Sequence, residues 1–356
     1  MALRVGVLLN RRILQKAVRG VRTFERIEYY VEAARELDVE LVLFDTAGAQ
    51  LNKGVVTGYV PGARGKLRHR TVELPGAVHK RALYRGAVGR RAVARLQRRV
   101  YLFNPEIPWD KYAVDQLLRS EPRLCPNLPE ARPLEPASYA WFQRQMDAGR
   151  EVFVKPRRGS LGLGILKVAP LPGGRCRLQS RSRRWSVSMG EAWRRLIRTC
   201  KHHYLQAGIP LCQDEGCRVD LRVVVQRGGD GRWHVPGMAA KRAPRRGFLT
   251  NVARGASVHV PEELLGRIFG PREAARILEE CAQLGLRAAE TLAARHPRFA
   301  DLGIDVGVDQ EGKPFLIEVN RRDLRIMMGL SGQHSVHRLV YKNPIAYARH
   351  VLLEGA

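Results

Sequence analysis

Three oxygen-bearing side chains late in the chain, Asp305, Glu318 and Asn320, have a spacing that could bind a metal ion. They lie in residues 300–320, ADLGIDVGVDQEGKPFLIEVN, where polar and apolar residues alternate with the period of two that is typical of strands. Carboxylate and amide oxygens are ligands that Mg²⁺ prefers in proteins, and Mn²⁺ uses the same set. The pattern therefore favours a hard divalent cation on the polar side of this segment.

The same segment predicts a β-hairpin with a two-residue turn at Glu311 and Gly312. In that register Asp305 lies directly opposite Glu318. Carboxylates in such a pair have Cβ atoms about 5 Å apart and repel each other unless a cation lies between them. A solvated hairpin with its acids outward is the alternative. The apolar positions, which we expect to face the core, are Ile304, Val306, Val308, Phe315, Ile317 and Val319.

A predicted strand over residues 151–155 ends in Lys155 and continues into a loop that contains Gly159, Ser160 and Gly162. Glycines allow backbone N–H groups to approach phosphate oxygens, and the lysine adds a positive charge. The loop is not a Walker A motif, since no Gly-Lys-Ser/Thr follows, and an ordinary hairpin turn has a similar composition. Together with the carboxylates of the hairpin, it predicts a nucleotide bound with a divalent ion.

Cationic side chains between these two segments could hold a phosphoryl group. Lys241 and Arg242 are adjacent, and Asn251 and Arg254 follow in a loop that contains glycine. Two cations, an amide and a further guanidinium could clamp a transferred phosphoryl group or an acyl phosphate. Surface basicity in a basic protein is the alternative.

The elements that must position these residues begin with a βαβ unit. Predicted strands at residues 4–9 and 39–44 flank an amphipathic helix at residues 22–36. Helical spacing over residues 80–100 predicts a helix with a dense arginine face, and a long helix at residues 271–294 precedes the hairpin.

The chain has 356 residues and a formal net charge of +28. This length predicts two to three domains, and the charge favours a polyanionic partner, an acidic substrate or nucleic acid. Much of the charge lies in two segments. Residues 64–99 hold twelve Lys or Arg and one acid, and residues 173–201 hold nine Lys or Arg and one acid.

The six cysteines include no CxxC pair, which is typical of reduced thiols inside a cell. A zinc cluster is a weak alternative, because the spacings match no familiar site. Its ligands would be Cys200, His202, His203, Cys212 and Cys217. No apolar run approaches the roughly 18 residues that span a bilayer, so we expect a cytoplasmic protein without a membrane partner.

Taken together, these motifs resemble the ATP-grasp superfamily and, within it, the YheC/YheD-type proteins associated with endospores. The resemblance covers nearly all of the chain. The motifs, in family order, are Phe103-Asn104-Pro105, Asp110-Lys111, VFVKP at 152–156 with its glycine loop, Asp220-Leu221-Arg222-Val223, Thr250-Asn251, Gly303-Ile304-Asp305, Ile317-Glu318-Val319-Asn320 and PIAYA at 344–348. Each is weak alone, and together they form a strong match.

The resemblance implies an α+β chain with an ATP-grasp fold, in which two α+β subdomains enclose ATP, preceded by an α/β pre-ATP-grasp domain. Residues 1–105 would form the pre-ATP-grasp domain. Residues 106–205 would form the subdomain with the phosphate-binding lysines and a glycine-rich lid. Residues 206–356 would form the C-terminal subdomain with the metal site.

The resemblance also assigns expected roles. Phosphates would contact Lys111 and Lys155, under a lid that contains Gly159, Ser160 and Gly162. Adenine would bind at Gln206, Ala207, Gly208 and Ile209. Magnesium, or manganese in its place, would be held by Asp305, Glu318 and Asn320. The γ-phosphate and a substrate carboxylate would be oriented by Arg222, Arg242, Asn251 and Arg254.

The chain departs from the family pattern after its metal strand. Where the family usually has a small residue, Lys and Pro, this chain has Arg321-Arg322-Asp323, which affects the expected substrate pocket. Leu128-Pro129-Glu130-Ala131 stands where Leu-Pro-x-Thr is common. Neither departure removes a metal ligand or a phosphate lysine, so we expect an intact nucleotide site.

The implied activity is that of an ATP-dependent ligase, which joins a carboxylate to an amine or a related nucleophile through an acyl phosphate. The net charge makes an acidic peptide, protein or amino acid the favoured substrate, in sporulation-related metabolism or associated with the spore. One alternative is a basic coat-associated protein that binds ATP or polyanions without catalysis. Another is a nucleic-acid binder, although aromatic residues make up only 7% of the chain.

Overall fold

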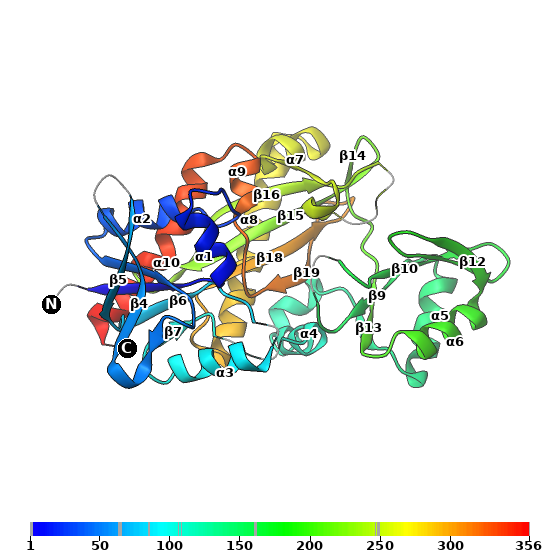
Figure 1. The fold of residues 1–356 in the computed structure, drawn as a ribbon. Coiled ribbons are helices and arrows are strands. Elements are labelled where there is room, and N and C mark those ends of the chain that lie inside the picture. The colour runs from blue at the N-terminus through cyan, green and yellow to red at the C-terminus, as the bar shows by residue number, and fades with distance from the viewer. Residues whose placement is uncertain are drawn as a thin grey trace.

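The described residues of this computed structural model form three β-sheets, which follow one another along the chain (Figure 1). Helices cover the sheets, so the content is mixed α and β, as predicted. The structure describes residues 3–62, 66–84, 86–105, 107, 109–159, 162–245, 247 and 250–355. No helix among them combines the length and the apolar composition needed to cross a membrane.

The first sheet has a parallel centre, as the βαβ pattern predicts. Its strand order is β3-β4-β2-β1-β6-β7, with β5 paired to β4, and β2, β1, β6 and β7 run parallel. Its strands are β1 Arg4–Leu8, β2 Glu40–Phe44, β3 Ala49–Gln50, β4 Val55–Pro61, β5 Leu67–Glu73, β6 Ala77–Lys80 and β7 Tyr101–Phe103. Its helices are α1 Arg11–Val18, the short η1 Leu51–Lys53, α2 Ile27–Glu36 and α3 Ala87–Leu96.

The helix predicted over residues 80–100 is wrong at its N-terminal end. Lys80 closes strand β6, and Lys80 and Arg81 are buried rather than part of an exposed arginine face. Arg81 pairs with Glu25 at 2.8 Å and with Asp301 at 3.2 Å. The sequence pattern missed this because both acids are distant in the chain, and buried cations survive only with such partners.

The second sheet forms the part of the molecule that projects to the right in Figure 1. Its order is β12-β11-β10-β9-β13-β8. Its strands are β8 Ala131–Pro133, β9 Val152–Pro156, β10 Leu166–Leu171, β11 Arg175–Gln179, β12 Arg184–Ser188 and β13 His203–Ala207. Its helices are η4 Pro136–Ser138, α5 Tyr139–Asp147 and α6 Met189–Thr199. Apolar residues of α5 and α6, including Phe142 and Leu196, pack against Val154, Val168 and Leu178 on one face of the sheet.

The third sheet is antiparallel and carries the predicted hairpin. Its order is β17-β16-β15-β18-β19, with β14 paired to β15. Its strands are β14 Gln213–Asp214, β15 Cys217–Arg227, β16 Trp233–Arg242, β17 Ser257–His259, β18 Asp301–Val308 and β19 Pro314–Asn320. The associated helices are α4 Lys111–Arg119, η3 Pro122–Asn127, η5 Val252–Arg254, α7 Pro261–Phe269 and α8 Pro271–Arg295. Leu118 of α4 and Leu124 of η3 lie in its core, so these two elements pack with the third sheet.

The last two helices, α9 Ile326–Leu330 and α10 His334–Glu354, join the first and third sheets. One apolar cluster contains Tyr341 and Ile345 of α10, Val5 of β1, Val224 of β15 and Ala239 of β16. The C-terminal helix therefore completes the core of a sheet that begins at the other end of the chain.

The hairpin pairs Asp305 with Glu318, as predicted, but its turn differs. Asp309 N donates to Lys313 O at 3.0 Å, so three residues close the turn rather than two. Gly312 has a φ of 83°, the left-handed conformation that such a turn requires. The Asp309 carboxylate accepts from Glu311 N and Lys313 N at 3.0 and 2.8 Å.

A β-bulge at Ile317 restores the register that the longer turn would have shifted. Val306 pairs with Leu316, whereas the next residue, Asp305, pairs with Glu318. Leu316 therefore enters the core, while Phe315 and Ile317 are only partly buried. The predicted core positions of Phe315 and Ile317 are wrong, because a one-residue shift reverses which face each side chain takes.

Candidate active site

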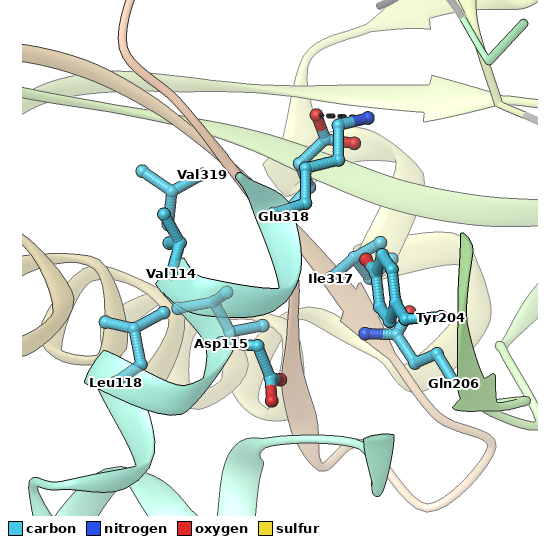
Figure 2. Close-up of a pocket in the computed structure, with 10 residues that line it drawn as sticks. Val114, Asp115, Leu118, Tyr204, Gln206, Ile317, Glu318 and Val319 are labelled. Carbon is cyan, nitrogen blue, oxygen red and sulfur yellow. Dashed lines mark ion pairs between the residues drawn. The ribbon is translucent and has the colours of Figure 1, made fainter. Parts of the chain in front are cut away.

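A pocket lies where α4, β13 and β19 meet (Figure 2). Tyr204 and Gln206 of β13 line one side and Ile317 and Glu318 of β19 the other. Figure 2 shows Ile317 directed towards Tyr204 and Gln206, so the residue that the bulge turned away from the core lines this pocket. The remaining lining residues are Lys111, Val114, Asp115, Leu118, Leu316 and Val319.

Lys155 lies next to the pocket, on β9. It is the cross-strand partner of Tyr204, and its ammonium donates a short hydrogen bond to the Gln206 side chain. Burial lowers the pKa of Lys155 to about 8, although Glu318 and Asp305 act in the opposite direction. A buried, weakly compensated ammonium of this kind is suited to an anionic ligand.

Lys111 is placed by the first turn of α4. Asp110 caps that helix by accepting from Tyr112 N and Ala113 N at 3.0 and 3.2 Å. Asp110 also pairs with Arg157 of the glycine-rich loop at 2.8 Å. Lys111 Nζ lies 3.1 Å from the carboxylate of Glu318, and the dashed line in Figure 2 marks this ion pair. The structure thus brings a predicted phosphate lysine to a predicted metal ligand.

Asp305 is the centre of a second group of charges. It lies 2.6 Å from Lys241 Nζ and 3.2 Å from Arg222, and it accepts from Asn320 Nδ2 at 3.0 Å. Burial acts to raise the pKa of Asp305, but Arg222 and Lys241 outweigh it and hold that pKa below its ordinary value. Asp305 is therefore an anion that neighbouring cations keep charged.

Lys241 was selected from sequence together with Arg242, but the family resemblance gave a role to Arg242 alone. Lys241 also pairs with Asp220 at 2.9 Å, and Thr250 donates to the Asp220 carboxylate. Strand β16 pairs Lys241 with Asp220, so Lys241 shares the face that carries Arg222 and Asp305. The period of two along β16 could have shown that only one of the adjacent cations 241 and 242 faces the site.

Arg242 is the cation on the opposite face. It pairs with Asp214 at 2.7 Å and Glu215 at 3.3 Å, at the β14–β15 turn. The structure therefore does not bring Arg242 to Asp305, and Lys241 takes the place expected for it. The physical reason is strand alternation, since neighbouring side chains point to opposite faces of a sheet.

The predicted adenine residues after Gln206 follow the pocket strand, since Ala207 ends β13 and Gly208 and Ile209 come directly after it. Ala207 N and Gly208 N donate to Glu130 O and Glu151 O at 2.8 and 2.7 Å, which fixes the chain after β13. A Cβ atom on Gly307 of the hairpin would lie 3.5 Å from Ile209 Cδ1, so Ile209 approaches the hairpin.

The predicted lid and the asparagine loop are described only in part. Gly159 and Gly162 have positive φ angles of 120° and 65°, which suit glycine. Ser160 lies outside the described residues. Asn251 accepts from Ala253 N at 2.9 Å and caps the short helix η5, which ends at Arg254. The side chain of Arg254 is also outside the described part.

The donor set fits a hard divalent ion. Asp305 and Glu318 are cross-strand partners, and the Asn320 amide already touches Asp305. Cations now balance both carboxylates, Lys111 at Glu318 and Lys241 with Arg222 at Asp305. Within the described ranges no three His, Cys, Asp or Glu side chains gather, so the zinc cluster considered from sequence does not form there.

A family model described as YheC/D like ATP-grasp matches residues 99–351 of this chain. The chain belongs to that family. The matched range contains the pocket, Lys155 and the hairpin, which are the features that the sequence resemblance selected. The ATP-grasp fold and the resemblance predicted from sequence are thereby confirmed.

Known proteins similar to this YheC/D-like chain agree with the fold. The endospore coat-associated protein YheD of Bacillus subtilis (strain 168) is 27% identical over 260 residues, which cover 69% of this chain and 56% of that relative. The chain therefore spans little more than half of that relative's length. D-cycloserine synthetase DcsG has a TM-score of 0.55 at 12% identity, covering 97% of this chain and 99% of the other. The ATP-grasp ligase PsnB, complexed with minimal precursor, has a TM-score of 0.56 at 15% identity, and the match covers 97% of this chain and 100% of PsnB.

Asp323, which departs from the family pattern after Asn320, makes buried contacts with two other parts of the fold. Asp323 is buried and lies 3.7 Å from Arg222, while its backbone oxygen accepts from Arg81 at 2.6 Å. A Cβ atom on Gly303 would lie 2.5 Å from Arg222 Nη1 and 2.9 Å from Asp323 Oδ1, so a side chain at position 303 would displace this pair. The guanidinium of Arg222 is therefore held between Asp305 and Asp323.

Proposed function

We propose that this YheC/D-like protein is an ATP-dependent ligase that activates a carboxylate as an acyl phosphate and transfers it to an amine or a related nucleophile. The observation that carries the proposal is the 3.1 Å ion pair between Lys111 and Glu318. It joins the nucleotide-side pocket to the hairpin that carries Asp305 and Asn320. An ATP-dependent ligase needs this combination, because a phosphate site must adjoin a metal site.

In the proposed complex, adenine lies between β13 and Ile317, with Gln206, Ala207, Gly208 and Ile209 around it. Lys111 and Lys155 bind the phosphates under the loop of Gly159, Ser160 and Gly162. Binding a polyphosphate would supply Lys155 with an anionic partner, since among the described residues it donates to a neutral amide and forms no ion pair. Nucleotide binding would therefore offset the free-energy cost of burying the Lys155 ammonium.

Asp305, Glu318 and Asn320 would hold Mg²⁺, or Mn²⁺ in its place. When bound, the ion neutralises charge on the phosphate oxygens and helps to orient them. Lys241 and Arg222, which are now paired with Asp305, would then be available to a phosphoryl group. Exchange of one set of ion pairs for another allows a cluster of buried charges to remain balanced in both states.

The proposed chemistry has two steps. An oxygen of the substrate carboxylate attacks the γ-phosphorus, the bond to the β-phosphate oxygen breaks, and ADP leaves as an acyl phosphate forms. A nucleophile with a lone pair then attacks the acyl carbon, phosphate leaves, and the nucleophile's proton is lost. Arg222 and Lys241 stabilise charge on the transferred group, and Asn251 and Arg254 are proposed to contribute to substrate orientation. No nucleophile from the protein is required.

An ADP-release screen with carboxylate and amine pairs, followed by mass spectrometry of the products, tests this function. We expect Mg²⁺-dependent ADP release with at least one pair, and a loss of at least 100-fold in Asp305→Asn and Lys155→Ala. Arg242→Ala is the matched control, since Arg242 lies on the opposite face, and it should retain turnover. Absence of ADP release over acidic amino acids and peptides would reject the ligase.

We further propose an acidic substrate and a cytoplasmic, spore-associated setting. The support is the net charge of +28 and the similarity to a protein named as endospore coat-associated. A non-catalytic polyanion-binding role is the competing function. It predicts that Asp305→Asn leaves biological activity intact, whereas the ligase proposal predicts that this variant is inactive.

A further inference from the structure

The second sheet has one face that its helices leave uncovered. Figure 1 shows α5 and α6 on the same side of β10, β11 and β12. On the opposite face Arg175 and Arg177 of β11 and Arg184 and Ser186 of β12 are exposed. We call this the open face, and define its basic part by Arg175 and Arg177.

The open face is continuous with the nucleotide pocket. Cross-strand pairs connect Gln206 to Phe153, Phe153 to Lys167, Lys167 to Gln179 and Gln179 to Arg184. Side chains in such pairs share one face of a sheet, and neighbouring strands are about 4.8 Å apart. This row therefore runs roughly 19 Å from the adenine side of the pocket to the outermost strand.

The charge of the basic part is not balanced within the described part of the chain. Residues 173–201 contain one acid, Glu191, which lies in α6 on the other side of the sheet. Arg175 and Arg177 form no ion pair with any residue that the structure describes. Arg175 donates to the backbone oxygen of Ser186 at 3.1 Å, which orients its guanidinium along the face.

We propose that the open face docks an acidic, extended peptide segment, and that this segment belongs to the carboxylate substrate. Exposed guanidinium groups without acidic partners attract carboxylates and form bidentate hydrogen bonds with them. The continuous row then leads a bound chain from the basic strands to the pocket beside Lys155. The binding surface stands on the geometry described here, while the peptide's role as substrate rests on the proposed function.

A peptide fits this surface better than a nucleic acid does. Strand β12 is the edge of its sheet, so its outer backbone groups are available to a further strand, which only a polypeptide can supply. Base stacking requires exposed aromatic rings. On this face Phe153 is partly buried beneath Lys155, and Trp185 faces the helices and packs against Arg195.

The test measures binding of a fluorescent twelve-residue oligo-glutamate to the full-length protein by anisotropy, with a Gly/Ser peptide of equal length as reference. Arg175→Glu/Arg177→Glu reverses the basic part. Arg91→Glu/Arg95→Glu, at two exposed positions of α3, is the control with the same change in net charge. Thermal unfolding and ATP binding establish that both double variants are folded.

We expect the wild type to bind the acidic peptide in a salt-dependent manner, and the β11 variant to bind at least tenfold more weakly. The α3 variant should lose less than threefold. Equal losses in both variants would show non-specific attraction by net charge, and would overturn the proposal. The proposal would also be overturned if the wild type bound duplex DNA or polyphosphate more tightly than the peptide and the β11 variant lost that binding.

ADP release separates this inference from the proposed function. If acidic peptides stimulate ADP release, the β11 variant should raise the KM for peptide at least tenfold while the KM for ATP changes less than twofold. If the peptide binds at the open face but no acidic amino acid or peptide stimulates ADP release, the docking surface is supported and the ligase function is rejected. If both double variants turn over peptides equally, the ligase function is supported and the docking surface is rejected.

Discussion

Lys155 is a buried cation that donates to a neutral amide rather than to a carboxylate. Burial lowers its pKa to about 8 from an ordinary value of 10.5. At neutral pH the folded protein thus keeps a charge that costs free energy, because the unfolded chain solvates the same ammonium better. Such a cost is typical of functional residues, where stability is lost in exchange for ligand binding.

We expect Lys155→Met to raise the free energy of unfolding at pH 7 by roughly 1–2 kcal/mol, since removal of the buried charge outweighs the lost hydrogen bond to Gln206. The folded pKa lies below the unfolded one, so the wild type gains stability as pH rises between about 8 and 10.5. The advantage of the variant should therefore be greatest below pH 8 and shrink above it. Urea unfolding at several pH values measures both effects.

ATP affinity provides the second measurement on Lys155→Met. Calorimetry should show at least a tenfold weaker affinity in the variant, because the phosphate cation is gone. Two results would contradict the assignment of Lys155 as a buried phosphate ligand whose charge costs stability. One is a variant less stable than the wild type at pH 7, and the other is a variant whose ATP affinity equals that of the wild type.

Asp323 is a positioning residue for Arg222. It holds one side of the guanidinium while Asp305 holds the other, at 3.7 and 3.2 Å. If Asp305 were bound to a metal ion as proposed, Asp323 would still hold Arg222 in place. The family pattern did not suggest this role, because the chain has Asp where a proline is usual.

We expect Asp323→Asn to lower kcat for ADP release at least tenfold and to change the KM for ATP less than threefold, because Arg222 loses its second anchor while the nucleotide contacts remain. Asp323→Glu should recover part of the loss. Equal changes in kcat and in the KM for ATP would instead indicate a general structural defect.

At the scale of elements, the hairpin of β18 and β19 combines a three-residue turn with a bulge at Ile317. The two irregularities compensate, so Asp305 and Glu318 remain opposite each other. The sequence predicted this pair from the alternation of residue types. It missed Leu316 as a core residue, because a bulge leaves no signature in a period-of-two pattern.

Deletion of Ile317 tests the role of the bulge. Val306 already pairs with Leu316, so the shortened strand should still place Glu318 opposite Asp305 in a regular ladder. We expect Mg²⁺-dependent protection against unfolding to persist, and ATP affinity to fall several-fold, because Ile317 lines the pocket. Loss of the Mg²⁺ effect with the fold intact would show that the bulge positions the carboxylates.

Element prediction from sequence succeeded where a pattern was long and local. The helix expected at residues 271–294 appears as α8, Pro271–Arg295, because its apolar spacing faces one sheet throughout. The segment around residues 80–100 failed because burial of Lys80 and Arg81 depends on acids in other parts of the fold. Arg242 was preferred to Lys241 for a related reason, since the orientation of each side chain follows from pairing with β15.

At the scale of the whole molecule, a buried charge network joins the first sheet to the third. Arg81 pairs with Glu25 and Asp301, and Arg325 lies 2.5 Å from Asp301. Arg81 also holds the backbone of Asp323, and Arg322 donates to Arg81 O at 3.1 Å. The N-terminal region therefore supports the segment that anchors Arg222.

We expect Arg81→Met to destabilise the protein by roughly 3–5 kcal/mol, because Glu25 and Asp301 lose a buried cationic partner. Chemical unfolding measures the change. Arg4→Met is the control, since Arg4 pairs with the more exposed acids Glu40 and Glu73, and it should cost less than about 1 kcal/mol. Equal small losses in the two variants would contradict the network.

The packing of α10 against β1 has a consequence for protein synthesis. The first sheet is translated before α10, and although α2 covers part of its apolar face, that cover is complete only after residues 334–354 have been translated. Until then that face is open to chaperones and to other nascent chains. A fragment of residues 3–105 should accordingly aggregate when expressed alone, and co-expression of a segment containing α10 should restore its solubility.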